Sequence, residues 1–341
     1  MTDNTNSTKQ RLLWLDMAKG YGILFIIWAH LDTSLLSVWM YSFHVPLFFI
    51  LAGFTFNTNT TFSTFLAKKS KSLLLPYLCL GGGILLYYIL NSILNGAFTW
   101  KFLLDLMLDF LLQRRFLPLW FITTLFLLNL IAYPMIRFIK NKILLFILSI
   151  LFAIVAMVYY SVGGGYLLWN IDVCFAAMPF FIIGHLCKEN HEKIKNFFDK
   201  KIKIFVAFII FLIINVSLLI LSTSMGYKVL DMYSSTYGCQ PLTYISAISG
   251  SFAIIMLSHL FDWKPILYIG KNSLLYFVWH LNLISPIVTK IFSICGFSLT
   301  ATSSIFLQYA YQFAVFFIVI GLLTICNFII EKTKLKFMLG K

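Results

Sequence analysis

The sequence predicts an all-α fold, a polytopic membrane helical bundle with about ten transmembrane helices. Of its 341 residues, 60% are hydrophobic and only 11% are charged, whereas soluble domains carry about 25% charged residues. Apolar runs of about twenty residues, the length that crosses the hydrocarbon core of a bilayer, recur along the chain. Inside lipid the backbone must satisfy its own hydrogen bonds, so each run is expected to be a helix.

Polar or basic stretches separate the apolar runs and set the expected helix ends. The first run follows a polar stretch, residues 1–11, and has no small-residue cleavage site, so we expect a retained helix and not a signal peptide. Between the third and fourth runs, residues 101–116 have the Leu and Phe spacing of an amphipathic helix lying at the membrane interface. The ten expected transmembrane helices cover residues 12–33, 37–56, 73–93, 118–138, 142–161, 166–186, 204–222, 241–260, 267–292 and 303–330.

The distribution of basic residues predicts which way the chain lies in the membrane. Ten helices put both termini on one side, and 21 of the 26 Lys and Arg residues fall on that side. The five exceptions are Lys101, Arg114, Arg115, Lys228 and Lys290. By the positive-inside rule, both termini are then cytoplasmic. We expect one membrane domain, residues 12–330, between an N-terminal tail, 1–11, and a basic C-terminal tail, 331–341.

This topology also explains the formal net charge of +14 without a nucleic-acid partner. The basic loops are expected to contact the anionic headgroups of membrane lipids. The six Cys residues form no CxxC pair and lie mostly within apolar runs, where Cys behaves as a small hydrophobe. Neither a disulfide framework nor a metal site is indicated.

The first predicted helix carries three ionisable residues, Asp16, Lys19 and His30. Steps of three and eleven residues place all three on one face of a helix. Ionisable groups within a membrane helix cost a few kcal/mol each by insertion scales, and they commonly mark function. At about 1.5 Å per residue, His30 lies roughly 16 Å further along the helix than Lys19. The alternative interpretation is a local Asp16–Lys19 pair and a hydrogen-bonded core histidine.

The run LDMAKG, residues 15–20, followed by His30 resembles the Arg/Lys-x10-His signature of acyltransferase family 3, the integral-membrane O-acyltransferases. The stretch DMAKGYGILFIIWAH is most similar to the fucose 4-O-acetylase-like branch. The resemblance covers about residues 11–330. Further matches in the family's order are FHVPLFF at 43–49, PY at 76–77, PLWF at 118–121, PFFIIG at 179–184, and IGKNS at 269–273 with His280.

The sequence departs from the family pattern at two places. Ala52 stands before Gly53 where the family commonly has Ser. Where the family often has two Arg three residues apart before the Pro-Tyr pair, this chain offers Lys68, Lys69 and Lys71. A register change of one residue rotates a helix position by about 100°, so which of these lysines faces the site stays open.

The resemblance implies transfer of an acetyl group from cytoplasmic acetyl-CoA to a hydroxyl of an envelope or exported glycan. It implies a glycan or glycolipid acceptor, with glycan-assembly proteins or a second copy of the chain as further partners. It also implies a multi-pass protein of the bacterial plasma membrane. The acceptor sugar, the hydroxyl position and the choice of acetyl over another short acyl group stay open.

The residue types fit such chemistry. His30 is the candidate general base, because an imidazole suits proton transfer near neutral pH; it is equally a candidate nucleophile that carries the acyl group transiently. Lys19, with one or more of Lys68, Lys69 and Lys71, is expected to dock the phosphates of coenzyme A. Asp16 can hold Lys19 in its charged form.

Four further residues are candidates for contacts around the acceptor. His44 follows His30 after a short turn and is expected to orient His30 or the acceptor, or to be a structural hydrogen-bonded histidine. Trp120, Asp172 and His280 are candidates for binding the substrate. Aromatic residues at this level also form the belt at a membrane interface.

Two other classes of function compete with acyl transfer. A transporter or flippase of a polar lipid or oligosaccharide would also have many helices and buried charges, but transporters often show repeated halves, and no internal repeat is visible here. A structural subunit of a glycan-assembly complex would not need the ionisable groups concentrated in the first three predicted helices.

Overall fold

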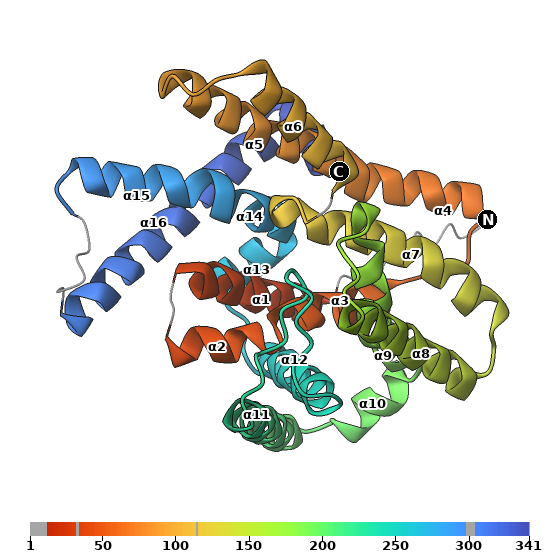
Figure 1. Cartoon of the computed structure of the whole chain (residues 1–341). Helices are drawn as coiled ribbons and strands as arrows, with labels where there is room; N and C mark the ends of the chain where they lie inside the picture. The colour runs from red at the N-terminus through yellow and green to blue at the C-terminus, as the bar shows by residue number, and fades with distance from the viewer. Residues whose placement is uncertain (1–11, 32–33, 114, 298–303, 341) are drawn as a thin grey trace, which may run out of the picture.

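The computed structural model describes residues 12–31, 34–113, 115–297 and 304–340 (Figure 1). The N-terminal tail 1–11, Arg114 and Lys341 lie outside the described residues. The described residues form helices and contain no β-strand, only one isolated bridge between Asp231 and Thr236. The predicted all-α bundle is confirmed.

Sixteen α-helices follow one another in the described chain. They are α1 (Leu13–Leu31), α2 (Leu35–Tyr41), α3 (His44–Thr55), α4 (Phe62–Lys69), α5 (Leu75–Leu94), α6 (Trp100–Leu112), α7 (Trp120–Phe138), α8 (Lys142–Ser161), α9 (Ile171–Glu189), α10 (His191–Phe197), α11 (Lys201–Ser224), α12 (Leu242–Leu260), α13 (Lys264–Lys271), α14 (Ser273–Trp279), α15 (Ser285–Ile294) and α16 (Ile305–Lys332). Short π-helical turns occupy Ser70–Leu74 and His280–Ile284, and short 3-10 turns occupy Leu117–Leu119, Leu168–Asn170 and Lys334–Leu339.

Nine helical segments among the described residues are long and apolar enough to cross a membrane. They coincide with the second to tenth predicted helices. The first predicted helix is present as α1, but its ionisable residues lower its hydropathy. Helix α1 lies in the middle of the bundle and packs against α2, α3, α12, α13, α14 and α16 (Figure 1). It can therefore carry polar groups that lipid-facing helices exclude.

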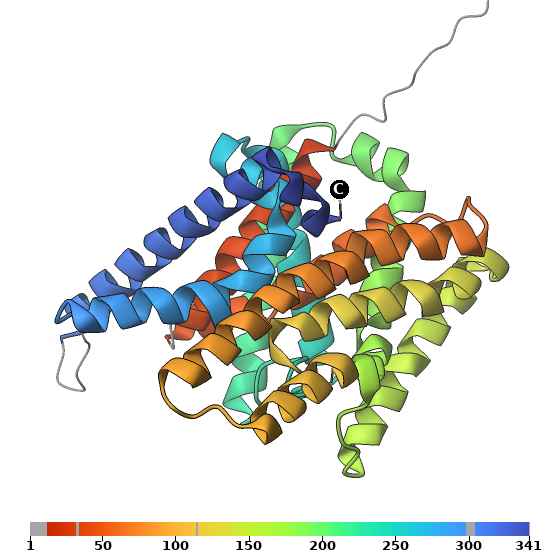
Figure 2. The same cartoon turned by 90° about the horizontal axis from the view of Figure 1, so that it is seen from above.

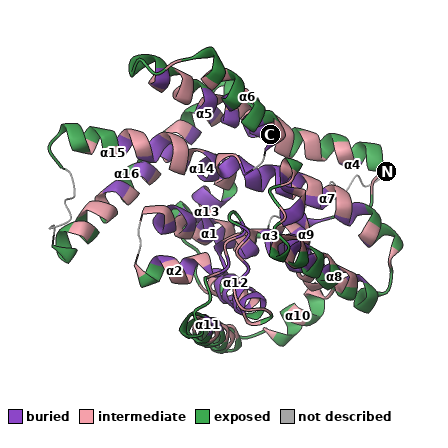
Figure 3. Cartoon of the chain, in the orientation of Figure 1, coloured by how far each residue is buried: buried purple, intermediate pink, exposed green. Residues whose placement is uncertain are grey.

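Burial falls from the centre of the bundle to its edge (Figure 3). Most residues of α3, α9 and α12 are buried, whereas α11 buries only Asn215 and Ser222. Helices α15 and α16 extend away from the central helices in both views (Figures 1 and 2). The exposed apolar faces of these outer helices are the surface that the bilayer would cover.

Close helix packing fixes α1 against α13. A Cβ atom on Gly270 would lie 1.7 Å from the Asp16 carbonyl oxygen, and one on Gly20 would lie 2.3 Å from the Ile266 carbonyl oxygen. Only glycine fits at such an approach of two backbones. Because α13 leads into α14 and then His280, this contact helps to set the position of His280 relative to α1.

The helix predicted over 37–56 is not continuous. Helix α2 ends at Tyr41, and α3 begins at His44 after Phe43 adopts φ −143° and ψ −13°. Pro46 explains the restart, because proline lacks a backbone N–H and is accommodated in the first turn of a helix, where that N–H has no partner. The break places His44 at the first position of α3.

The helix predicted over 267–292 is also divided. Asn272 separates α13 from α14, and a π-turn, His280–Ile284, separates α14 from α15. Pro286 follows at the start of α15, just as Pro76 follows the π-turn Ser70–Leu74 at the start of α5. A proline inside an α-helix clashes with the carbonyl four residues earlier. A local π adjustment accommodates it within a membrane helix.

The helix predicted over 101–116 is present as α6, which buries Leu106 and Phe110. The orientation of the termini and the interfacial position of α6 remain predictions.

Candidate functional site

Two cavities lie along α1, one near its end and one near its start. The first, the histidine cavity, has a volume of about 320 Å³. Its walls are Ile26, His30, Tyr41, His44, Val45, Leu117, Pro118, Trp120, Asp231, Tyr233, Phe277, His280, Leu281 and Asn282. The second, the lysine cavity, has a volume of about 230 Å³. Its walls are Lys19, Ile23, Phe48, Leu51, Ala52, Thr55, Lys69, Ser72, Leu73, Phe121, Leu125, Asn129, Ser273, Leu274 and Phe277.

Three histidines from three different elements meet at the histidine cavity. His30 comes from the last turn of α1, His44 from the first position of α3, and His280 from the π-turn after α14. The His30 and His280 rings lie 5.1 Å apart between centroids. Tyr41 lies between His30 and His44, with its ring centroid 5.9 Å from that of His30 and 4.8 Å from that of His44.

All three imidazoles are held in the same way. The Nδ1 atom lies 2.7 Å from the Ile26 carbonyl oxygen in His30, 2.7 Å from the Met40 oxygen in His44, and 2.8 Å from the Phe277 oxygen in His280. A carbonyl oxygen only accepts hydrogen bonds, so each Nδ1 carries a proton and donates it. In the neutral ring, Nε2 then carries the lone pair, which is the form that a general base needs.

The histidines differ in exposure. His44 and His280 are buried, at 3% and 1% exposed, whereas His30 is half-buried. The Nε2 atom of His280 is buried and has no hydrogen-bond partner among the described residues. His30 is therefore the imidazole that an incoming molecule reaches most easily, and His280 adds an unsatisfied acceptor to the same cavity.

The loop between α11 and α12 closes one side of the histidine cavity through Asp231 and Tyr233. The Asp231 carboxylate accepts hydrogen bonds from the Tyr233 backbone N–H at 3.0 Å and the Ser234 hydroxyl at 2.6 Å. Partial burial raises the pKa of Tyr233, so its hydroxyl stays protonated at neutral pH. The sequence did not predict this wall; the only signal is that Asp231 is the single acidic residue between Lys228 and Asp262.

Arg115 ties this loop to the helices. Its guanidinium donates to the Asp172 carboxylate at 2.5 Å, to the Ser235 hydroxyl at 2.6 Å and to the Tyr233 carbonyl oxygen at 2.7 Å. The Tyr160 hydroxyl also donates to Asp172. Arg115 and Asp172 are 4% and 1% exposed. This buried network orders the loop that carries Asp231.

The Arg115 network changes the interpretation of two residues. Asp172 was expected to contact the substrate, but its carboxylate is held by Arg115 and does not line the histidine cavity. Arg115, which the charge distribution placed among the five basic residues on the far side of the membrane, is a buried member of this network. Trp120 and His280, the other expected substrate-binding residues, do line the cavity.

The structure places Lys19 and Lys69 together at the lysine cavity. Lys69 also lies 5.6 Å from the Phe65 ring and 5.8 Å from the Phe56 ring. Lys68 and Lys71 are exposed and do not line the cavity. The π-turn after Lys69 sets this register.

Asp16 is buried, at 2% exposed, and lines neither cavity. Its backbone carbonyl oxygen lies where α1 packs closely against Gly270 of α13.

An aromatic partition separates the two cavities. Phe277 lines both of them, and its ring lies 5.0 Å from that of Phe121, which lines the lysine cavity. Phe48 packs on Phe121 at 6.0 Å. Both Phe121 and Phe277 are buried. The site thus has ammonium groups that suit an anion at one end and imidazoles that can accept a proton at the other, and the Phe277 ring lies between them.

A family model described as an acyltransferase domain matches residues 12–331. No curated protein and no solved structure matches the chain.

Proposed function

The chain belongs to this acyltransferase family and is a membrane acyltransferase, and from that membership we propose that it transfers an acetyl group from cytoplasmic acetyl-CoA to a hydroxyl of an envelope or exported glycan. The observation that carries the proposal is the pair of cavities along α1. One contains the lysines that suit a phosphorylated donor, and the other contains the histidines that suit an alcohol acceptor.

In this proposal the donor enters at the lysine cavity. Lys19 and Lys69 pair with phosphate oxygens of coenzyme A, since ammonium groups form strong charge-assisted hydrogen bonds with phosphate. The hydroxyls of Ser72 and Ser273, at the same cavity, add neutral donors. The thioester end of the pantetheine arm then reaches past Phe277 to the histidines.

The acceptor occupies the histidine cavity, beside Trp120, Asp231 and Asn282. An aromatic face, a carboxylate and an amide are side chains that can contact a sugar ring and its hydroxyls. In this arrangement Asp172 acts through Arg115, by holding the loop that carries Asp231.

His30 Nε2 takes the proton of the acceptor hydroxyl as its oxygen attacks the thioester carbonyl carbon. The new C–O ester bond forms, the C–S bond breaks, and the proton returns from the imidazolium to the coenzyme A thiolate. The Ile26 carbonyl oxygen, which accepts from Nδ1–H, stabilises the imidazolium while it exists. In the two-step variant, the same Nε2 attacks the thioester carbonyl carbon and the coenzyme A thiolate leaves. The acceptor oxygen then attacks the acyl-imidazolium, the C–N bond breaks as the C–O bond forms, and the hydroxyl proton passes to the thiolate.

The test follows coenzyme A release from acetyl-CoA by purified protein in nanodiscs, with and without a glycolipid fraction from the source cells. His30→Ala is expected to lower acceptor-dependent turnover at least about a hundredfold, the scale of losing a general base, while coenzyme A binding is retained. Full turnover by His30→Ala would remove the proposed role of His30. If the wild type neither binds nor consumes acetyl-CoA but moves the glycolipid between leaflets, the transporter alternative replaces the proposal.

A further inference from the structure

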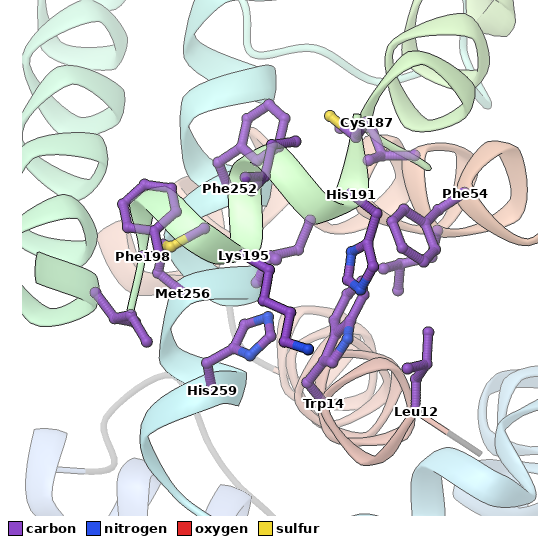
Figure 4. Close-up of a pocket in the computed structure, with 15 residues that line it drawn as sticks. Leu12, Trp14, Phe54, Cys187, His191, Lys195, Phe198, Phe252, Met256 and His259 are labelled. Carbon is purple, nitrogen blue, oxygen red and sulfur yellow. The ribbon is translucent and has the colours of Figure 1, made fainter. Parts of the chain in front are cut away.

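A third cavity, about 310 Å³ in volume, lies between α1, α3, α10 and α12 (Figure 4). It is separate from the proposed catalytic site. It shares Leu51 with the lysine cavity but contains neither Lys19 nor Lys69. Most of its wall is apolar, from residues such as Ile50, Phe252 and Met256. Apolar walls of this kind exclude a hydrated ion as the whole ligand.

Nitrogen-bearing side chains gather at one part of this cavity. Figure 4 shows Lys195, His191 and His259 directed toward the Trp14 ring. The His259 ring stacks on Trp14 at 4.9 Å, and the His191 ring lies 5.5 Å from Phe54, which contacts Trp14 at 5.0 Å. The Lys195 ammonium group and the two imidazole rings therefore lie together at one part of a mostly apolar cavity.

Two polar groups at this place have no partner in the described part of the chain. Lys195 has no carboxylate within ion-pair distance there. The indole Nε1 of Trp14 is buried without an acceptor among the same residues. A buried donor without an acceptor costs about 1–3 kcal/mol, so an anionic or acceptor-rich group would be stabilised here.

A second apolar groove, about 440 Å³ in volume, runs along α11 and meets the cavity at Phe198. Its wall includes Val206, Ile210 and Phe211. Helix α11 packs on α12 but fully buries no apolar residue. Val206 and Ile210 of the groove wall are 48% and 51% exposed, so this groove opens to the face that the bilayer would cover. The cavity and the groove together offer space for two hydrocarbon chains that diverge from a common point near α10.

We propose that this cavity binds an anionic phospholipid from the surrounding leaflet. One acyl chain fills the cavity, the second lies in the groove along α11, and the phosphate contacts Lys195 with His191 and His259 beside it. The apolar walls require a hydrocarbon chain, and the cationic group favours a negative headgroup. This inference does not depend on acyl transfer.

The test measures lipid binding to delipidated protein in detergent by native mass spectrometry. The probes are palmitoyl-oleoyl phosphatidylglycerol and the matching zwitterionic phosphatidylcholine. We expect phosphatidylglycerol to bind more tightly to the wild type. Lys195→Gln should weaken phosphatidylglycerol binding about fivefold, the effect of one Lys beside an anionic lipid. It should weaken phosphatidylcholine binding less, because the choline cation offsets the charge of the phosphate.

Lys193→Gln is the matched control. Lys193 lies on the same helix and is exposed, as Lys195 is, but it does not line the cavity, so its loss removes the same charge without changing the site. Ile194→Trp and Met256→Trp, made separately, each fill the cavity. Each should abolish binding of phosphatidylglycerol at this site. The melting temperature of each variant shows whether it remains folded. If both Trp variants unfold, the comparison of Lys195→Gln with Lys193→Gln still tests the proposal.

Three results would overturn the proposal. The first is equal affinity of the wild type for the two lipids. The second is equal weakening by Lys193→Gln and Lys195→Gln, which would show only diffuse surface attraction. The third is displacement of phosphatidylglycerol by soluble glycerol phosphate or by oleic acid at similar concentration, which would assign the site to a headgroup or to a fatty acid alone.

Discussion

The buried pair Arg115–Asp172 offers the sharpest test of how the histidine cavity is built. Arg115→Met keeps the length and apolar stem of the side chain but removes every hydrogen bond of the guanidinium. Both charged side chains are 1% exposed, so the variant leaves the Asp172 carboxylate buried without its cation. Removing one partner of such a pair costs about 3–5 kcal/mol of unfolding free energy.

The matched control is the surface pair Lys203–Asp199, whose side chains are 45% and 49% exposed. Solvent screens this pair, so Asp199→Asn should lower the free energy of unfolding far less than Arg115→Met. The assay is unfolding in mixed micelles of a mild detergent and SDS, which gives the free energy of unfolding for each variant.

The same substitution has a functional signature, because Arg115 orders the loop that carries Asp231 and Tyr233. We expect the KM for the acceptor to rise in Arg115→Met while the KM for acetyl-CoA stays unchanged, since the lysine cavity is not part of this network. If Arg115→Met destabilises the protein no more than Asp199→Asn, the buried network does not hold the loop. If both KM values rise together, the loop does not belong to the acceptor side.

Three further changes test other parts of the structure. Lys69→Gln should raise the KM for acetyl-CoA about tenfold or more by loss of a charge-assisted contact. The control Lys68→Gln, on the exposed side, should leave this KM unchanged. Similar effects of the two variants would argue against Lys69 being the lysine that faces the cavity. Phe277→Leu should increase coenzyme A release in the absence of acceptor, because a thinner partition lets water reach the thioester; an unchanged ratio of hydrolysis to transfer would mean that Phe277 is no barrier. Gly270→Ala should lower the free energy of unfolding by about 1–3 kcal/mol, because its methyl group would lie 1.7 Å from a carbonyl oxygen of α1. The control is Gly321→Ala, which should not destabilise the protein because its methyl group meets nothing within 4 Å.

The sequence was sufficient to predict which segments are helical and which face of α1 carries Lys19 and His30, but it did not predict the breaks within 37–56 and 267–292. Length and hydropathy decide whether a segment can cross a membrane, and helical periodicity decides which residues share a face. His30 and Lys19 could therefore be predicted to lie apart along one helix, and the structure places them at the ends of two adjoining cavities.

The choice of Lys69 over Lys68 and Lys71 could not be predicted, because it depends on a π-turn that adds a residue to the helix before Pro76. The role of the loop between α11 and α12 was missed for a different reason. Asp231 lies at the histidine cavity on a loop that Arg115, far away in the sequence, binds at Tyr233 and Ser235. Periodicity carries no information about such a contact.

The two π-turns have a consequence for how this bundle can diversify. Each contains one residue more than an α-helical turn, and each lies beside a cavity, at Ser72 and at His280. Loss of a single residue there would restore α-helical winding and rotate the neighbouring side chains by about 100°. Related chains that differ by one residue at either position can then present a different side chain to donor or acceptor while every helix axis stays in place. Substrate preference in such a bundle can change through a one-residue deletion, and alignments of relatives should be expected to need a gap at these two turns.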